Sequence, residues 1–237
     1  MKDKITKLIN VYKKNGLSGL IKKSTKYIKA TYIDKYNLFT LLKKKKYTCI
    51  IKKILEENKY DRIILWRSNF GYNVPLYQRP QHIANNLSKM NSLVFYEVTT
   101  MTDNILTLKE TQNNLYLFNF NNKVLNKILM SLLSNIEKPK YIEIYSTNWS
   151  LTLNELITYE KNNFKIIYEY IDHLSPELSG TSSLPKNISD KYNYMLKNKN
   201  IFVVVTADKL MTDIIKKRGK TNLVLSTNGV DYNFFKE

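Results

Sequence analysis

The pattern of apolar and polar positions divides the chain near residue 60. After it, short runs rich in β-branched and aromatic residues alternate with segments of helical length. The predicted strands cover 62–66, 92–98, 115–120, 140–146, 164–171, 201–206 and 222–227. The predicted helices cover 80–90, 123–135, 150–161, 186–198 and 207–218. This alternation predicts an α/β fold, with a Rossmann-like, doubly wound, mainly parallel sheet and helices on both faces.

The first 59 residues follow a different pattern. Apolar residues recur every three or four positions, with lysines between them, as one apolar helix face requires. Gly16 and Gly19 interrupt this pattern, which favours two helices over one, and a further helix is expected up to about Lys59. We therefore predict a basic amphipathic helical leader at 1–59 and a Rossmann-like domain at 60–237.

The positive charge is concentrated at the start of the chain. The net charge is +18, and the first 60 residues hold 17 lysines against four acidic residues. This segment suits docking on an anionic membrane surface. The alternative is a solvated lysine face on helices that pack against the sheet. Nucleic-acid binding would depend on charge alone, and the remaining residues are closer to neutral, so we expect no nucleic-acid partner.

Composition and missing motifs exclude several kinds of chemistry. One cysteine, Cys49, and two histidines cannot form a clustered zinc site or a disulfide framework. The sequence has no G-x-G-x-x-G, phosphate-loop, D-x-D or G-x-S-x-G motif in a suitable place. It also has no secretory signal and no apolar run of the ~18 residues that cross a bilayer. We therefore expect a cytoplasmic location and neither a metal nor a bound cofactor.

Candidate site residues follow from the rule that ligands bind at the carboxyl ends of parallel strands. After strand 62–66 comes a loop in which Gly71 is expected to adopt unusual backbone angles, and then a helix start with Arg79 and Pro80. The helix dipole and Arg79 favour an anionic group there. The alternative is that Arg79 pairs with a carboxylate such as Glu97, while His82 packs on the sheet.

Three further places lie at predicted strand ends. Asp172 and His173 follow strand 164–171, and the other two are 205–210 and 226–235. Adjacent side chains at a strand end diverge, so Asp172 and His173 are not expected to form an acid–base dyad. One of them would reach a ligand while the other holds the loop.

Together, these segments resemble the N-terminal half of a GT-B glycosyltransferase of the family 4 type, in the bacterial subgroup with a QRPQH helix start. The matching segments, in order, are VPLYQRPQHIANNLSK, LVFYEV, YEYIDHLS, VVVTADKL and STNGVDYNFF. The resemblance covers roughly residues 60–237. It implies metal-free, retaining hexosyl transfer from a nucleotide-sugar to a cell-surface polysaccharide or lipid-linked acceptor. The enzyme would then be peripheral on the inner face of the plasma membrane.

The resemblance also implies roles for individual residues. Those expected on the acceptor side of an interdomain cleft are Gly71, Gln78, Arg79, Gln81 and His82. His173, with Asp172 beside it, would contact the transferred sugar as the catalytic position. Asn228, Gly229 and Val230 would form the hinge to a second domain, and Phe234 and Phe235 would begin the packing between domains.

One departure from the family concerns the donor site. The second domain of such enzymes binds the nucleotide-sugar, and this sequence ends at Glu237, where that domain would begin. We therefore expect the chain to need a donor domain in cis or in trans and to show no turnover alone. The alternative is a non-catalytic, glycosyltransferase-like scaffold at the membrane surface.

Overall fold

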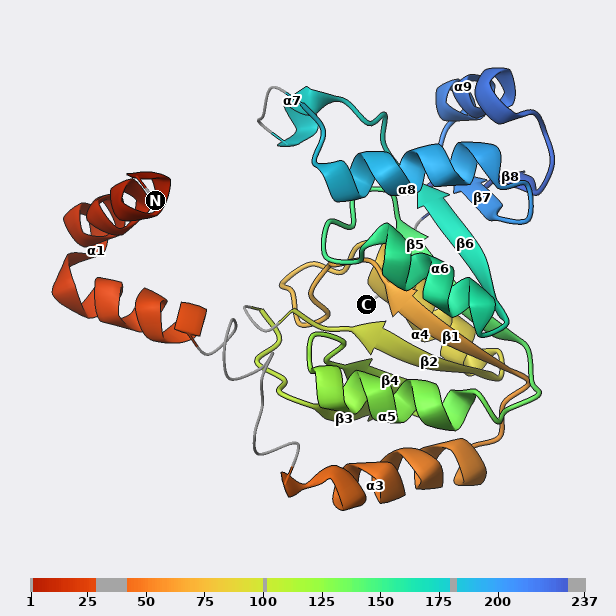
Figure 1. Cartoon of the computed structure of the whole chain (residues 1–237), viewed down its shortest axis with the longest axis horizontal. Coiled ribbons are helices and arrows are strands. Elements are labelled where there is room, and N and C mark those ends of the chain that lie inside the picture. The colour runs from red at the N-terminus through yellow and green to blue at the C-terminus, as the bar shows by residue number, and fades with distance from the viewer. Residues whose placement is uncertain (1, 29–41, 100–101, 180–182, 230–237) are drawn as a thin grey trace.

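The computed structural model describes residues 2–28, 42–99, 102–179 and 183–229, and its centre is an eight-stranded sheet (Figure 1). The strand order is β3-β4-β2-β1-β5-β6-β7-β8. Only β3 is antiparallel to its neighbour. The strands are β1 (Arg62–Arg67), β2 (Ser92–Glu97), β3 (Leu108–Gln112), β4 (Leu115–Phe118), β5 (Lys140–Tyr145), β6 (Phe164–Tyr170), β7 (Phe202–Val205) and β8 (Leu223–Leu225).

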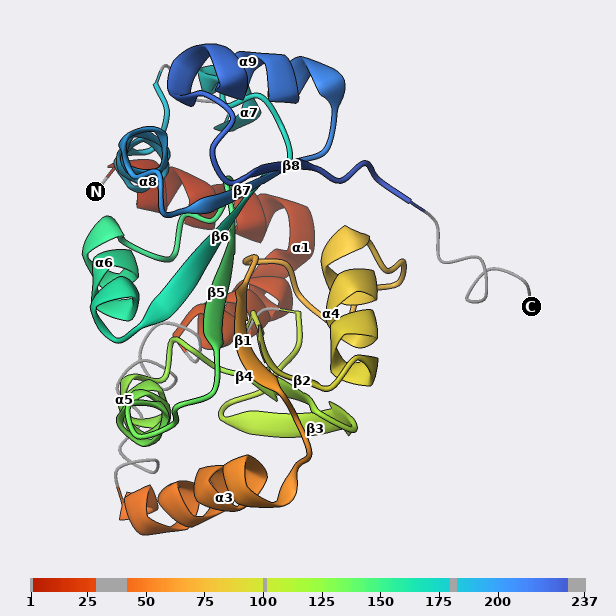
Figure 2. The ribbon, with the colours of Figure 1, turned by 90° about the vertical axis from the view of Figure 1, so that its right-hand side faces the viewer.

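Helices cover both faces of this sheet. The helices of the described residues are α1 (Lys2–Ile28), α3 (Lys44–Glu57), α4 (Arg79–Lys89), α5 (Lys123–Leu133), α6 (Leu153–Lys161), α7 (Pro176–Ser179), α8 (Lys186–Lys197) and α9 (Asp208–Arg218). Figure 2 shows α4 on one face and α5, α6 and α8 on the other. The predicted fold class, a doubly wound and mainly parallel α/β sheet, is therefore confirmed.

The double cover explains why the central strands are apolar at nearly every position. In β1, Ile63 and Leu65 join the core under α5 and α6, whereas Ile64 and Trp66 join the core under α4. Successive side chains of a strand point to opposite faces, so a sheet covered on both sides needs apolar residues in both registers. This is why the sequence shows continuous apolar runs here rather than alternation.

The sequence analysis missed one strand, β3, and the short helix α7. The β3 segment, 108–112, reads LKETQ, and its three central residues are exposed. A polar strand at the sheet edge carries no apolar periodicity, so its sequence does not distinguish it from a loop. A turn at Asn114, whose φ is 62°, leads from β3 into the buried strand β4.

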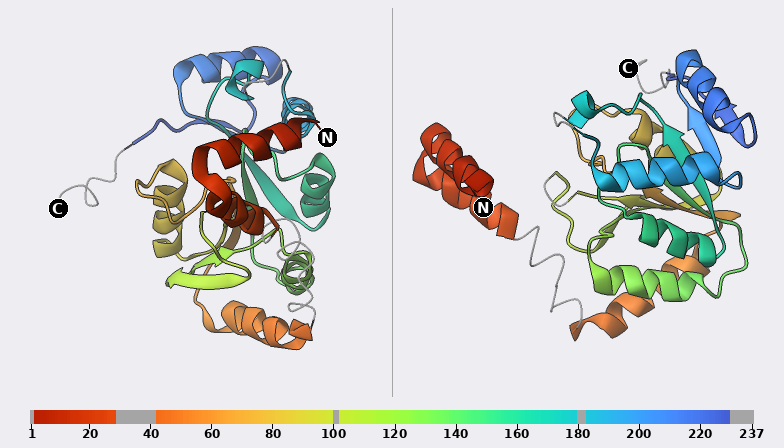
Figure 3. Two further views of the ribbon diagram at one scale, coloured as in Figure 1. Left: turned by 90° about the vertical axis from the view of Figure 1, so that its left-hand side faces the viewer. Right: turned by 45° about the horizontal axis from the view of Figure 1, so that its top comes forward.

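The basic leader contains two structurally different parts. In α1, Gly16 has φ 63° and ψ −171°, so the helix is broken there, as the sequence predicts. Figures 1 and 3 show α1 away from the sheet. In contrast, α3 lies beside α5 and buries Ile51, Ile54 and Leu55 in the core. Of the helices described, none combines the length and apolarity needed to cross a membrane.

Candidate functional site

The strand order places a topological switch point between β1 and β5. From β1 the chain moves outward through β2 to β4, and it then returns to the other side of β1 to form β5. The connections from these two neighbouring strands leave in opposite directions at their carboxyl ends. In an open α/β sheet, this is where ligands bind.

Arg79, the first residue of α4, connects three segments at this edge. Its Nε lies 3.2 Å from Glu169 Oε2 on β6, and the two side chains are 15% and 3% exposed. Its Nη2 donates to Ser226 Oγ at 3.1 Å, and its Nη1 donates to the Thr227 carbonyl at 3.3 Å. Arg79 therefore connects the helix start to β6 and to the segment that follows β8.

Arg79 does pair with a carboxylate, as the alternative predicted. The example given, Glu97, is wrong, because Glu97 points to the opposite face of the sheet. Glu97 alternates with Tyr96, which packs under α4, and therefore lies on the side of α5 and α6. Its cation is Arg67, whose Nη2 lies 3.0 Å from Glu97 Oε1. Glu169, on the α4 side, is the carboxylate that Arg79 reaches.

A fourth segment joins the same set through Thr206, which directly follows β7. Its hydroxyl donates to the Ile171 carbonyl at 2.9 Å, just beyond the end of β6. Thr206, within the predicted site at 205–210, is thus bonded to Ile171, the residue before the predicted site at 172–173. All four segments that sequence analysis selected lie at one edge of the sheet.

The loop after β1 is held by Gln81 and Asp103. The buried Gln81 donates from Nε2 to the Gly71 carbonyl at 2.6 Å and accepts from the Gln78 backbone N–H at 3.0 Å. Asp103 Oδ1 accepts from the backbone N–H groups of Tyr72 and Asn73, at 2.9 and 2.7 Å. Gln81 and Asp103 therefore fix the loop conformation before any ligand binds.

Gly71 is needed here for a reason other than the one expected from the sequence. Its φ is not positive, and the left-handed residue of this loop is Asn69, with φ 60°. A Cβ added to Gly71 would lie 2.3 Å from Thr102 Oγ1, well inside van der Waals contact. The expectation of unusual backbone angles at Gly71 is therefore wrong, because the constraint is space.

The other predicted site residues lie mostly in solvent. Gln78, Asp172 and His173 are exposed, and His82 is half-buried, its ring centroid 5.9 Å from that of Tyr77 in an edge-on contact. His82 thus packs against Tyr77 of the preceding loop. Asp172 and His173 follow β6, the strand that Arg79 contacts through Glu169.

The predicted hinge is described only in part. Asn228 and Gly229 are exposed and directly follow the Ser226–Thr227 segment that Arg79 binds. Val230, Phe234 and Phe235 lie outside the described residues.

Sequence analysis missed a buried carboxyl pair beneath α4. Glu143 on β5 and Glu169 on β6 are 5% and 2% exposed. Burial, followed by the charge of Glu169 and a hydrogen bond to it, raises the pKa of Glu143 well above its ordinary value. Arg79 is paired with Glu169, and the raised pKa favours the protonated form of Glu143. A glutamate inside the apolar run 140–146 was the available signal.

A second buried polar cluster lies on the opposite face, where β1 and β2 end. The Glu97 carboxylate accepts from Arg67 Nε, from the Asn69 backbone N–H, from Asn148 Nδ2 and from Ser150 Oγ, at 3.0, 2.9, 3.2 and 3.3 Å. Asn148 also donates to the Arg67 carbonyl at 2.7 Å. These bonds join the loops that follow β1 and β5 on either side of the switch point.

Lys191 on α8 is fully buried close to this cluster, and its Nζ donates to the Leu151 carbonyl. Burial, and then the positive charge of Arg67, lower the pKa of Lys191 to about 8. The apolar periodicity of the sequence did not indicate that Lys191 is buried. A lysine at a core-facing position of a helix interrupts that periodicity and is not recognised as a core residue.

The charges at the edge are therefore mostly balanced within the protein. Within the described part of the chain, no group of three or more His, Cys, Asp or Glu side chains is placed to hold a metal ion. The exposed groups around Arg79 are amides, an imidazole, a carboxylate and backbone atoms, which suit hydrogen bonding to a hydroxyl-rich ligand. No protein-family model matches the chain, and no curated protein matches it.

Proposed function

We propose that residues 60–237 form the acceptor-side half of a GT-B glycosyltransferase of the family 4 type. The reaction would transfer a sugar from a nucleotide-sugar donor to a cell-surface polysaccharide or lipid-linked acceptor. The observation that supports this most strongly is Arg79. This arginine of the QRPQH segment binds Glu169 of the YEYIDH segment and Ser226 and Thr227 of the STNG segment.

Direct contact between these segments is a stronger argument than their order in the sequence. Ser226 is 147 residues from Arg79 along the chain. Every parallel sheet brings the carboxyl ends of its strands to one edge, but that arrangement does not by itself require these two side chains to form a hydrogen bond. Here the residues that carry the resemblance are also the residues that bind one another. This contact between the matching segments supports the proposal.

The electrostatics favour an uncharged glycan as the ligand of this half. Glu169 balances the charge of Arg79, and the raised pKa of Glu143 disfavours a second negative charge in this group. Gln78 and His82 would hydrogen-bond the acceptor. Asp172 and His173 would contact the transferred sugar, in a site that a second domain screens from water.

The proposal includes two partners. In the proposed enzyme, a donor domain in cis or in trans supplies the nucleotide-sugar site. The lysine-rich leader associates with an anionic membrane surface, which brings the site to a lipid-linked acceptor. The alternative function is a non-catalytic scaffold of the same fold at the membrane.

Trp149 provides a direct test of acceptor binding. It is 63% exposed and follows Asn148 at the carboxyl end of β5, so its fluorescence reports on ligands at this edge. Titration with lipid-linked and polysaccharide acceptors is expected to give a saturable change that Gln78→Ala and His173→Ala weaken. Asn135→Ala, an exposed amide at the opposite edge, is the matched control and should leave the titration unchanged.

Three results would each contradict part of the proposal. If no acceptor changes the Trp149 signal, or if all three variants behave alike, the scaffold alternative is favoured. Sugar transfer by the purified chain, measured with labelled nucleotide-sugars, would disprove the requirement for a separate donor domain.

A further inference from the structure

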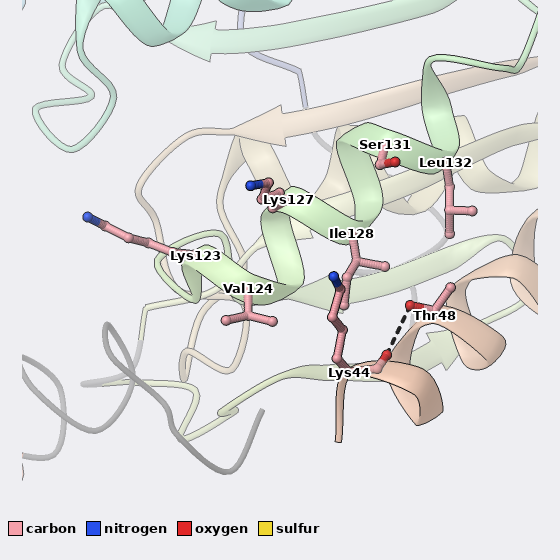
Figure 4. A pocket seen from close by; sticks show the side chains of 8 residues that line it. All are labelled: Lys44, Thr48, Lys123, Val124, Lys127, Ile128, Ser131 and Leu132. Atoms are coloured by element: carbon pink, nitrogen blue, oxygen red, sulfur yellow. Dashed lines mark hydrogen bonds between the residues drawn. The ribbon is translucent and has the colours of Figure 1, made fainter. Parts of the chain in front are cut away.

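A basic groove lies between α3 and α5, and none of its lining residues belongs to the strand-end site. It has a volume of about 500 Å³, and the lysines that line it are Lys44 on α3 and Lys123 and Lys127 on α5 (Figure 4). None of its described lining residues is acidic. The groove is thus a cationic concavity to which the proposed transferase site assigns no role.

The two helices add their own positive potential at one end of this groove. Both begin at the end marked by Lys44 and Lys123 in Figure 4 and run in the same direction. The first turns of both helices lack an acidic residue, and Lys43–Lys46 occupy the start of α3. Two helix N-termini beside clustered lysines make this end of the groove electropositive.

The floor of the groove is apolar, which narrows the choice of anion. Val124, Ile128 and Leu132 point from α5 toward α3 in Figure 4, and the hydroxyl residues Thr48 and Ser131 complete the lining. Thr48 Oγ1 donates to the Lys44 carbonyl at 2.9 Å and retains acceptor capacity. A free phosphate or a nucleic-acid backbone would leave the apolar floor unused.

We propose that this groove binds the phosphate headgroup of an anionic phospholipid in a bilayer surface. The lysines contact the phosphate, while the glycerol and upper acyl region cover the apolar floor. The inference rests on the membrane association proposed above and not on the transferase assignment. It adds a defined site to what would otherwise be diffuse attraction by lysines.

The position of the groove fixes how the domain faces the bilayer. Because α5 follows β4 and runs antiparallel to it, its start lies at the carboxyl edge of the sheet, which also carries Arg79 and His173. The same edge faces α1, whose Tyr12, Leu17 and Ile21 are exposed (Figure 3). A headgroup in the groove therefore turns the strand-end site toward the membrane.

Vesicle flotation of the full chain tests the site. The probe vesicles contain phosphatidylcholine with or without 30% phosphatidylglycerol, and the test variant is Lys44→Gln/Lys123→Gln/Lys127→Gln. The loss of three lysines should lower the partition of this variant into anionic vesicles by about tenfold to hundredfold relative to the wild type. The matched control is Lys161→Gln/Lys165→Gln/Lys216→Gln, which removes equal charge from exposed positions at the opposite edge.

The control should change partition by less than about threefold, a small loss of long-range attraction. A fluorophore on Cys49, an exposed residue of α3, should brighten when wild type binds anionic vesicles, and the test variant should lose this response. Three outcomes would overturn the inference. In the first, the two triple variants lose vesicle binding equally; in the second, the wild type floats equally with neutral and anionic vesicles; in the third, duplex DNA binds with an affinity that depends on the same three lysines. Loss of flotation only in variants of α1 would also overturn it, while leaving membrane association intact.

Discussion

The buried Arg67–Glu97 pair allows the contribution of one interaction to be predicted from its surroundings. Replacing Arg67 by Met keeps an apolar chain of similar length but removes the cation from Glu97, which is 1% exposed. The Glu97 carboxylate would keep three donors, from Asn69, Asn148 and Ser150, and no counter-charge. Removing one partner of a buried pair costs about 3–5 kcal/mol. The three remaining donors place Arg67→Met near the lower end, at ~3 kcal/mol.

The double variant Arg67→Met/Glu97→Gln separates this uncompensated charge from other effects. A neutral amide at position 97 keeps most of the hydrogen bonds, and replacement of a whole buried pair is often close to neutral. We therefore expect the double variant to be more stable than Arg67→Met alone, even though it carries one more substitution. In a domain of this size, ~3 kcal/mol corresponds to about 10 °C in Tm.

Urea unfolding followed by tryptophan fluorescence measures these differences. Trp66 is fully buried beneath α4 and Trp149 is 63% exposed, so a Trp149→Phe background leaves Trp66 as the reporter of the core. Arg67→Met should lower the urea midpoint without changing the slope. The reasoning fails if Arg67→Met loses less than about 1 kcal/mol, or if the double variant is no more stable than the single one.

Three further predictions concern buried or crowded positions. Because the pKa of Glu143 is raised in the folded state, its contribution to stability is fully present at pH values below the ordinary glutamate pKa and is lost as the pH rises through the raised pKa. Glu143→Gln should flatten that part of a Tm–pH profile. Because the pKa of Lys191 is lowered to about 8, stability should rise between pH 8 and the ordinary lysine pKa, and Lys191→Met should remove this rise in urea titrations. Gly71→Ala places a methyl 2.3 Å from Thr102 Oγ1 and should cost about 1–3 kcal/mol by urea unfolding, partly recovered by Thr102→Ala.

Sequence reasoning succeeded where burial on both faces leaves a strong signal. The strands β1, β2, β4, β5, β6 and β7 lie inside the sheet, so their apolar runs could be recognised without knowing their neighbours. The edge strand β3 carries Lys109 and Glu110 in solvent and has no such signal. The carboxyl ends of the strands could be located for the same reason, and with them the approximate position of the candidate site.

The side-chain pairings within the site depend on information that one sequence does not contain. Choosing between Glu97 and Glu169 as the partner of Arg79 requires the strand order and the face on which each glutamate lies. Because side chains alternate along β2, Glu97 lies on the face away from α4. This alternation identifies the partner of Arg79 only once α4 is known to cover the other face. Gln81 illustrates a different limit, because a polar residue at a helix start resembles a ligand-binding residue even when it is buried and supports a loop.

In the proposed two-domain enzyme, the contacts of Arg79 indicate where movement between the domains would begin. The Ser226 backbone N–H donates to the Val205 carbonyl at 2.8 Å, so the chain still belongs to the sheet at that residue. Arg79 then holds the Thr227 carbonyl, and the exposed Asn228 and Gly229 follow. A proposed hinge at Asn228 can therefore rotate without breaking a sheet hydrogen bond before it, whereas rotation at Thr227 would disturb Arg79. Because Arg79 also starts α4, such a disturbance would reach the helix start that we propose to lie on the acceptor side, and in the proposed two-domain enzyme it would couple domain closure to acceptor binding.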